Sequence, residues 1–374
     1  MNPCIVIMTQ LISIFIYDVG GEFTPKDVRS ICECLGEVKK ERISDIYTDY
    51  FIELGMTPVR ALVEEREVEF AGLKASFKKY LKVLVFGVVL VEFQFDFGKP
   101  LNFQKLREAA SCETLVIDNQ PKRLADIARE EFDRVMESAS GKFKWTYEVP
   151  NFVDNYKIIV DEKLKSKKEI CAVILNEDPK TLSDDIIEGM TKSAVRYSKK
   201  DAAFVSNTSS YIYSEEFPED IINIIELSRM QLFELKVYDF ILDKQIGGTY
   251  AVLEGIPKGG GILGLKLFSE KYRKLSEVAY DLMEMRIELV DSIKDVMNSM
   301  KVTNDIFLAF LYRRVNEEFR LEDWYGSVRS KLEELGRAYS MVVDSQEMMK
   351  STTLEMWIVI LILLELVVLL VLGV

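Results

Sequence analysis

Apolar and polar side chains alternate one by one in two stretches of the N-terminal half, residues 91–97 and 143–149. Alternation with a period of two is typical of a strand that buries one face. Short runs of β-branched and aromatic residues predict further strands at 11–18, 46–54, 112–118, 156–160 and 170–175. Capping residues and helical spacing predict helices between them, at 25–35, 101–110, 121–138 and from Thr181 onward. Because strands and helices follow no strict βαβ order, we expect an α+β domain over residues 1–214.

Two apolar runs in this domain have a competing interpretation. Residues 81–97 are long enough to suggest a membrane span, but Gly87 and the alternation that follows it favour one bent strand or two strands. Residues 5–17 could belong to a signal peptide, but no basic residue precedes Lys26. We therefore expect a buried strand there.

The spacing of apolar residues becomes helical after Pro218. A helix is predicted from Phe217 to about Ile241, with its end by Gly247–Gly248. The glycine-rich residues 255–264 lack the preceding strand and the Gly-Lys-Ser/Thr ending of a phosphate-binding loop, so we interpret them as a hinge.

Heptad repeats dominate the rest of the chain. Apolar residues follow an a/d pattern over 275–296 and again over 332–363, with an apolar helix at 306–315 and a turn at 323–326 between the two runs. Sustained heptads predict helices that pack on one another. Residues 215–353 are therefore expected to form a coiled-coil-like helical stalk or hairpin.

The C-terminal run Trp357–Val374 is apolar apart from one charge. Eighteen helical residues span roughly 27 Å, close to the ~30 Å hydrocarbon layer of a bilayer. This length predicts a C-terminal transmembrane helix over 354–374, and hence a tail-anchored, single-pass membrane protein with its N-terminal bulk in the cytoplasm. Arg337 and Lys350 ahead of the run agree with this orientation. A buried core helix is the alternative.

Glu365 lies near the centre of this apolar run, where a carboxylate costs a few kcal/mol on insertion scales. Its expected partners are a second Glu365, a polar group of another protein, or a proton. We hypothesise that it marks an association face, and the alternative is a protonated side chain that faces lipid. The residues assigned to the anchor and this face are Trp357, Ile358, Leu361, Ile362, Glu365 and Leu369.

Composition narrows the possible chemistry. The chain of 374 residues has 48 basic and 61 acidic side chains, a net charge of -13, which argues against broad nucleic-acid binding. The basic cluster at Lys74, Lys78, Lys79 and Lys82 is interpreted as a solvated face. There is no histidine, which excludes Ser-His and Cys-His nucleophiles and the commonest metal ligand.

The five cysteines are scattered, and Cys32 and Cys34 form an isolated C-x-C pair without further ligands to complete a zinc site. Paired carboxylates are numerous, but none stands beside a nucleotide-binding motif. We expect structural cysteines, and no metal, cofactor or catalytic residue.

The run from Leu354 to Glu365 resembles the C-terminal signature of the "required for meiotic nuclear division" family, which has a Leu-Glu-Trp-Ile-Ile/Val run with a Glu inside its terminal membrane helix. Met356 is inserted between Glu355 and Trp357, a departure from the family's contiguous Leu-Glu-Trp. Residues 227–234 also resemble the amphipathic helix ahead of that family's stalk. The resemblance covers about the last 20 residues, with a looser match back to Pro218.

This resemblance implies a self-associating α/β and helical body held by one terminal helix, with no established catalytic residues; one family member is linked to translation. A fainter likeness is to CorA-type magnesium channels, which need two membrane helices and a Gly-Met-Asn loop that this sequence lacks. The sequence therefore predicts a non-enzymatic, self-associating scaffold or tether for a cytoplasmic machine, with a membrane, a second copy and an unknown protein as partners. The alternative is a carboxylate-based, metal-dependent enzyme or ligand sensor in the α+β domain.

Overall fold

The computed structural model describes residues 9–38, 59–254 and 306–372, together with Tyr280 and Met283. Within the second range, residues 86, 119, 141–152, 193, 197–199 and 215–217 are not described. The predicted strands at 46–54 and 143–149, the hinge at 255–264 and the heptad run at 275–296 therefore lie outside the described residues.

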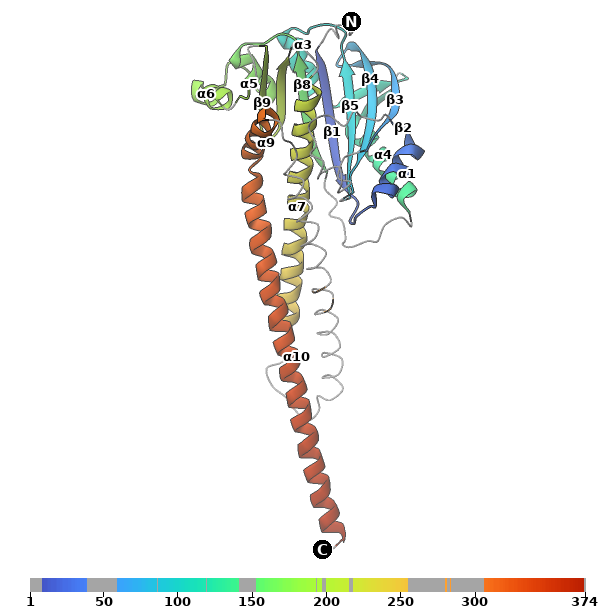
Figure 1. Ribbon diagram of the computed structural model, residues 1–374, viewed down its shortest axis with the longest axis vertical. Coiled ribbons are helices and arrows are strands. Elements are labelled where there is room, and N and C mark those ends of the chain that lie inside the picture. The colour runs from blue at the N-terminus through green and yellow to red at the C-terminus, as the bar shows by residue number, and fades with distance from the viewer. Residues whose placement is uncertain are drawn as a thin grey trace. The chain divides into compact units, whose positions relative to one another are not determined.

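A single mixed sheet forms the centre of the N-terminal part (Figure 1). Its strand order is β7-β6-β3-β4-β5-β1-β8-β10-β9, with β2 paired to β3. All pairs are antiparallel except β8 and β10, which run parallel. The strands are β1 (Gln10–Asp18), β2 (Glu37–Val38), β3 (Val59–Phe70), β4 (Leu73–Val83), β5 (Val88–Asp96), β6 (Thr114–Ile117), β7 (Gln120–Arg123), β8 (Asp154–Asp161), β9 (Asp201–Val205) and β10 (Ser209–Ser214).

One face of the sheet is covered by helices from the first half of the chain (Figure 1). Odd-numbered residues of the central strands, such as Phe15, Phe93 and Phe77, form an apolar core with these helices. Burial of such aromatic and aliphatic side chains is the main stabilising contribution of this layer. The helices are α1 (Pro25–Leu35), α3 (Phe103–Ser111), α4 (Leu124–Ala139) and α5 (Lys167–Leu175), and α6 (Asp184–Lys192) lies beside α5 and β9.

Helices from the second half of the chain cover the opposite face. They are the first part of α7 (Glu219–Glu254) and α9 (Ile306–Phe319). The Tyr156 ring of β8 meets Phe319 of α9 edge-on at 5.6 Å between ring centroids, and Tyr312 of α9 donates a hydrogen bond of 2.7 Å to Gln231 of α7. The last described helix, α10, runs from Leu321 to Leu372.

Two compact units divide the chain. The first comprises Met1–Val237 and Ser292–Trp324, and the second Tyr238–Asp291 and Tyr325–Val374. In the second unit the end of α7 contacts α10 through polar pairs, including Ser327 with Asp239 at 2.7 Å and Tyr250 with Glu334 at 3.4 Å.

The predicted C-terminal transmembrane helix is corrected by the structure. Among the described residues, no helix has both the length and the apolar character that crossing a membrane requires. The apolar run is the last part of α10, which is described to Leu372. The predicted single-pass location with its cytoplasmic bulk and the predicted membrane partner are corrected with it, because both were argued from that span. Self-association through the stalk was argued from the heptads and stays a prediction.

Several individual elements also differ from the prediction. Residues 170–175 are helical, because Ser166 and Glu169 form a capping box at the start of α5. The predicted turn at 323–326 lies inside α10, and the break between α9 and α10 is at Arg320, with a φ of 56°. By contrast, the run 81–97 consists of the end of β4 and the whole of β5, which confirms the two-strand interpretation.

Candidate functional site around the first turns of α7

Helix α7 is almost completely buried from Ile221 to Tyr238, and several of its buried residues are polar. Glu226, Ser228, Gln231 and Glu234 are each at most 1% exposed, and Arg229 is 5% exposed. A helix within a core is normally apolar, since burying a charge is costly unless it is paired. These side chains therefore mark the part of the structure where charge is concentrated in the interior.

Four charged residues form what we call the charge cluster: Arg60, Lys82, Glu92 and Glu226. The first three come from neighbouring strands β3, β4 and β5, where Arg60 lies directly opposite Lys82. Lys82 Nζ is 2.5 Å from Glu226 Oε2 and 3.3 Å from Glu92 Oε2, and Arg60 donates to Glu92 Oε1 at 2.9 Å. The cluster thus contains two cations and two carboxylates between the sheet and α7.

The two carboxylates of the charge cluster have opposite pKa shifts. Burial raises the pKa of Glu226 to about 7, although the ammonium of Lys82 lowers it. Burial also raises the pKa of Glu92, but Arg60 and Lys82 together lower it more, so its net pKa lies below the ordinary value. Glu92 lies close to both Arg60 and Lys82, whereas Glu226 pairs mainly with Lys82, which explains why their pKa values shift in opposite directions.

A second buried ion pair lies one turn further along α7. Arg229 contacts Asp154 of β8 with both Nε and Nη2, at 2.5 and 2.7 Å, and donates to the carbonyl of Asn207 at 3.1 Å. Its guanidinium also lies 5.0 Å from the centre of the Tyr156 ring. The Nη2–Oδ1 contact is a hydrogen bond and the Nε–Oδ2 contact is a close ion pair, and together they fix orientation as well as supplying attraction. The arrangement holds α7 in one register on the sheet.

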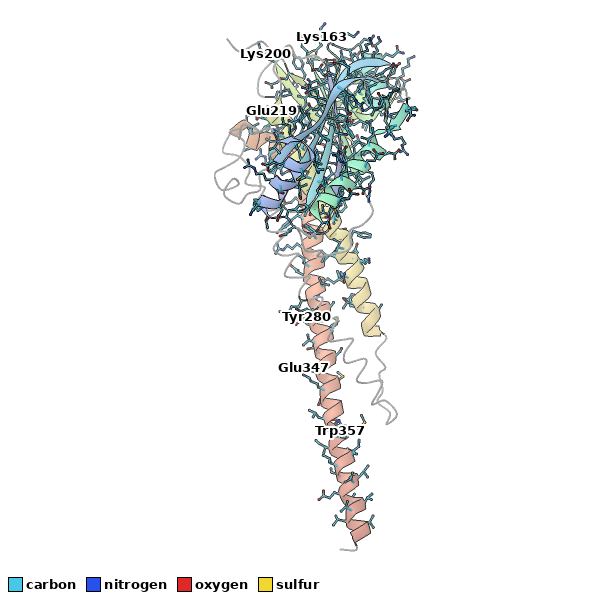
Figure 2. The ribbon with its side chains drawn as sticks, turned by 90° about the vertical axis from the view of Figure 1, so that its right-hand side faces the viewer. Lys163, Lys200, Glu219, Tyr280, Glu347 and Trp357 are labelled. Carbon is cyan, nitrogen blue, oxygen red and sulfur yellow. The ribbon has the colours of Figure 1, made fainter. Side chains whose placement is uncertain are left out.

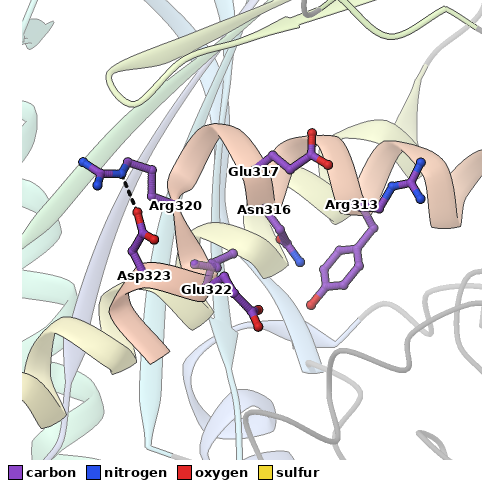
Figure 3. A pocket seen from close by; sticks show the side chains of 8 residues that line it. Arg313, Asn316, Glu317, Arg320, Glu322 and Asp323 are labelled. Carbon is purple, nitrogen blue, oxygen red and sulfur yellow. Dashed lines mark hydrogen bonds and ion pairs between the residues drawn. The ribbon is translucent and has the colours of Figure 1, made fainter. Parts of the chain in front are cut away.

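A cavity of about 530 Å³ is formed by the last turns of α9 and the first turn of α10 (Figure 3). Arg313, Glu317, Glu322 and Asp323 line it, together with Arg320 between the helices. Arg320 pairs with Asp323 at 2.7 Å, and both side chains are more than 60% exposed. Its charges are thus solvated and of both signs, so this surface favours no particular ligand.

The residues that the sequence assigns to an association face all lie on α10 and are all exposed: Trp357, Ile358, Leu361, Ile362, Glu365 and Leu369. Figure 2 shows Trp357 on this part of the helix. The structure brings none of them into contact with the charge cluster. Their association stays a prediction.

The structure also places the C-x-C pair and the basic cluster of the sequence analysis. Cys32 and Cys34 are two residues apart on α1, so Cys32 is buried in the core and Cys34 is exposed. Within the described part of the chain, no group of three or more Cys, Asp or Glu could hold a metal ion. Lys79 and Lys82 are buried, 6% and 3% exposed, so their assignment to a solvated face is wrong.

The charge cluster was missed from the sequence, although a signal was present. Lys82 and Glu92 interrupt apolar strand sequences, and Glu226 stands between Ile225 and Leu227. A single charge inside an apolar run indicates a buried partner elsewhere. The sequence does not indicate which of many acidic residues that partner is.

Comparison with known proteins identifies the family. Residues 8–219, more than half of the chain, match the family described as "Uncharacterized protein MJ0711, N-terminal domain". The chain belongs to the MJ0711 family. The protein of that name from Methanocaldococcus jannaschii is 25% identical over 253 residues, which cover 65% of this chain and 73% of that protein. No solved structure matches. The family match contains the whole described sheet and ends at the start of α7.

Proposed function

We infer that the protein is a non-enzymatic scaffold that binds a partner protein through the apolar end of α10. The observation that supports this is the row of exposed apolar side chains from Leu354 to Leu370, which are between 44% and 81% exposed. Single exposed apolar residues are ordinary, but a contiguous group of this length is typical of an interaction surface. The charge cluster and the Arg229–Asp154 pair of the first unit, by contrast, are internal contacts between the sheet and α7.

Glu365 restricts what the partner is. It is the one charged residue between Trp357 and Leu372, and a partner that covers the apolar side chains also removes Glu365 from water. A buried carboxylate needs an opposite charge or a hydrogen-bond donor. A second copy packed in parallel would place one Glu365 beside another, which is unfavourable. We therefore infer an apolar helix of another protein with a lysine or arginine opposite Glu365.

The test compares two charge reversals on the same helix. Full-length wild type, Glu365→Lys and Glu347→Lys are used to capture proteins from cells, and a captured protein is then purified and titrated directly. Glu347 is exposed on α10 outside the apolar end (Figure 2), so it is a matched control. We expect binding to fall at least about tenfold for Glu365→Lys, or about 1.4 kcal/mol, and to be unchanged for Glu347→Lys.

Three results would contradict the scaffold function. They are equal binding by both variants, a homodimer of wild type that Glu365→Lys dissociates, and binding of the purified chain to lipid vesicles without any protein partner. A thermal-shift screen of the full chain with Mg²⁺, Mn²⁺ and nucleotides tests the enzymatic alternative, because a ligand that binds the folded state raises its melting temperature.

A further inference from the structure

A small cavity lies at the start of α4, on the face of the sheet opposite the charge cluster. Its volume is about 70 Å³, which is large enough for a small ion and its contacts. Polar residues from three places line it: Ser13 of β1, Asn155 and Lys157 of β8, and Arg123 at the N-cap of α4. Ser13 and Lys157 are direct cross-strand neighbours.

The buried hydroxyl of Ser13 points to a ligand in this cavity. Ser13 is 2% exposed, its hydroxyl has no hydrogen-bond partner among the described residues, and it lines the cavity. Buried hydroxyls are nearly always hydrogen-bonded, and one without a partner costs roughly 1–3 kcal/mol. A ligand in the cavity would accept a hydrogen bond from this hydroxyl.

The first turn of α4 supplies further donors. The N-cap residue Arg123 makes no side-chain capping bond, and the backbone N–H of Leu124 donates to the carbonyl of Glu113. The next residue, Ala125, also lines the cavity. First-turn N–H groups have no partner within the helix, and the helix dipole makes this end favourable for an anion.

The charged residues give the cavity a positive balance. Lys157 Nζ donates to the carbonyls of Ala110 at 2.6 Å and Cys112 at 3.3 Å, which leaves the third N–H of the ammonium for a ligand. Burial lowers the pKa of Lys157, and the nearby Glu113 raises it. Arg123 and Lys157 together outweigh the single carboxylate of Glu113 that lines the cavity.

We propose that this cavity binds a small oxyanion, a phosphate or a carboxylate group, held by the Ser13 hydroxyl, the Asn155 amide, the Arg123 guanidinium, the Lys157 ammonium and the Ala125 N–H. Every one of these groups is a hydrogen-bond donor, and an oxyanion is an acceptor with several lone pairs. The site is independent of the scaffold function: it lies in the sheet domain that the family match covers, and it gives that domain a ligand.

The test is a calorimetric titration of the full chain with inorganic phosphate and, separately, with acetate, at matched ionic strength. We expect wild type to bind at least one of the two anions with a Kd below about 10 mM. The anion that binds more tightly identifies phosphate or carboxylate as the group recognised. Arg123→Gln should weaken binding about tenfold. Lys122→Gln removes the same charge from the neighbouring residue, which does not line the cavity, and should leave binding unchanged.

Ser13→Ala tests the buried hydroxyl, with Ser228→Ala as its control. Ser228 is also fully buried with an unpartnered hydroxyl, but it lies on α7. Ser13→Ala should weaken binding several-fold, and Ser228→Ala should not. The proposal is overturned if wild type binds neither anion, if Lys122→Gln and Arg123→Gln weaken binding equally, or if Ser13→Ala binds like wild type. Should Ser13→Ala not fold, the pair at positions 122 and 123 still decides, because both side chains are exposed.

Discussion

Lys82 of β4 and Glu226 of α7 are 144 residues apart in the sequence, and their Nζ and Oε2 atoms are 2.5 Å apart in the fold. Both side chains are almost completely removed from water, with 4% and 2% of the side chain exposed. An ion pair of this kind is sensitive to the loss of one partner, because the other charge is then left buried alone. The pair therefore connects the second strand of the β3–β4 hairpin to helix α7.

Removing the cation of this pair should destabilise the fold strongly. Lys82→Met leaves Glu226 without its nearest cation, and we expect a loss of about 3–5 kcal/mol of unfolding free energy. Urea denaturation followed by circular dichroism measures it. Lys78→Met is the control on the same strand, since Lys78 and its partner Glu65 are 35% and 49% exposed, and it should cost less than about 1 kcal/mol.

A double substitution separates the lost pair from a general effect of the methionine. Lys82→Met with Glu226→Leu removes both charges, while Glu92 keeps Arg60 at 2.9 Å. We expect this double variant to be clearly more stable than Lys82→Met alone, because no carboxylate is then left unpaired. Equal stability of Lys82→Met and Lys78→Met would show that the pair contributes little.

The raised pKa of Glu226 predicts a pH dependence with a definite sign. The folded value of about 7 exceeds the ordinary 4.5, so the folded state binds the proton more tightly, and this contribution is present below about pH 4.5 and lost as the pH rises through 7. Glu92, whose pKa is lowered, acts in the opposite sense, but only as the pH falls through its folded pKa. The two effects therefore fall in different pH ranges.

Glu226→Gln should consequently gain stability relative to wild type as the pH rises. Between about pH 5 and pH 8 we expect a relative gain on the order of 2 kcal/mol, because the amide mimics the protonated acid and does not titrate. Lys82, Glu92 and Arg60 face position 226 and are unchanged in this comparison. Guanidinium unfolding at four pH values measures the difference, and parallel pH profiles would refute it.

Local sequence signals predicted individual helices and strands better than they predicted which side chains contact one another. The alternation at 91–97 and the proline at the start of α1 were sufficient to place β5 and α1, because periodicity and capping are local properties. The helix α5 was predicted as a strand from its β-branched residues, although Ser166 and Glu169 carried a capping signal. The charge cluster depends on strand register and on the packing of α7, and neither can be read from a single sequence.

The terminal apolar run shows the same limit. Its composition predicted a membrane span, but among the described residues no helix combines the length and the apolar character that a span requires. In the structure the run is continuous with a helix that begins at Leu321 and carries Glu322 and Asp323 in its first turn. The side chains at Trp357 and Leu361 are exposed, as a surface for a partner requires, whereas the candidate anion site at Ser13 depends on a buried hydroxyl that no sequence pattern indicates.

Arg229→Lys should not be a conservative substitution. Lysine keeps the charge but cannot reproduce the two contacts to Asp154 and the bond to the Asn207 carbonyl. We expect a loss of about 2 kcal/mol in chemical denaturation. Arg29→Lys is the matched control, because Arg29 pairs with Glu33 on the exposed face of α1, with 63% and 54% exposure. Comparable effects of both substitutions would contradict the role of the bidentate geometry.

The cysteines should differ sharply in reactivity. Burial raises the pKa of Cys32 to about 12 and also raises the pKa of Cys171, so both are protonated and inaccessible in the folded protein. Cys34 is exposed. Iodoacetamide under native conditions should therefore modify Cys34 and spare the other two, as peptide mass spectrometry can show. Denatured protein is the control, in which all three should react, and rapid native labelling of Cys32 would contradict its place in the core.

Lys331 should hold the end of α7 against α10 in the second unit. Its ammonium lies 2.8 Å from Asp239 and 2.6 Å from Asp243, one turn apart on α7, and its side chain is 20% exposed. Burial lowers the pKa of Lys331, but the hydrogen bonds that its ammonium donates to the two aspartates raise it more, so the ammonium stays charged at neutral pH. Lys331→Met should destabilise this helix pair by about 1 kcal/mol, since the site is partly screened by water.

Hydrogen exchange locates this effect. In Lys331→Met we expect faster exchange in peptides from 238–254 as well as from α10, because both helices lose the same contact. Arg329→Met is the control on the neighbouring exposed face, where Arg329 pairs with Glu333 within α10 and both are more than 60% exposed. It should leave exchange in 238–254 unchanged. If Lys331→Met accelerates exchange in α10 alone, the contact does not hold the two helices together, and the polar pairs of Ser327 and Tyr250 must do so instead.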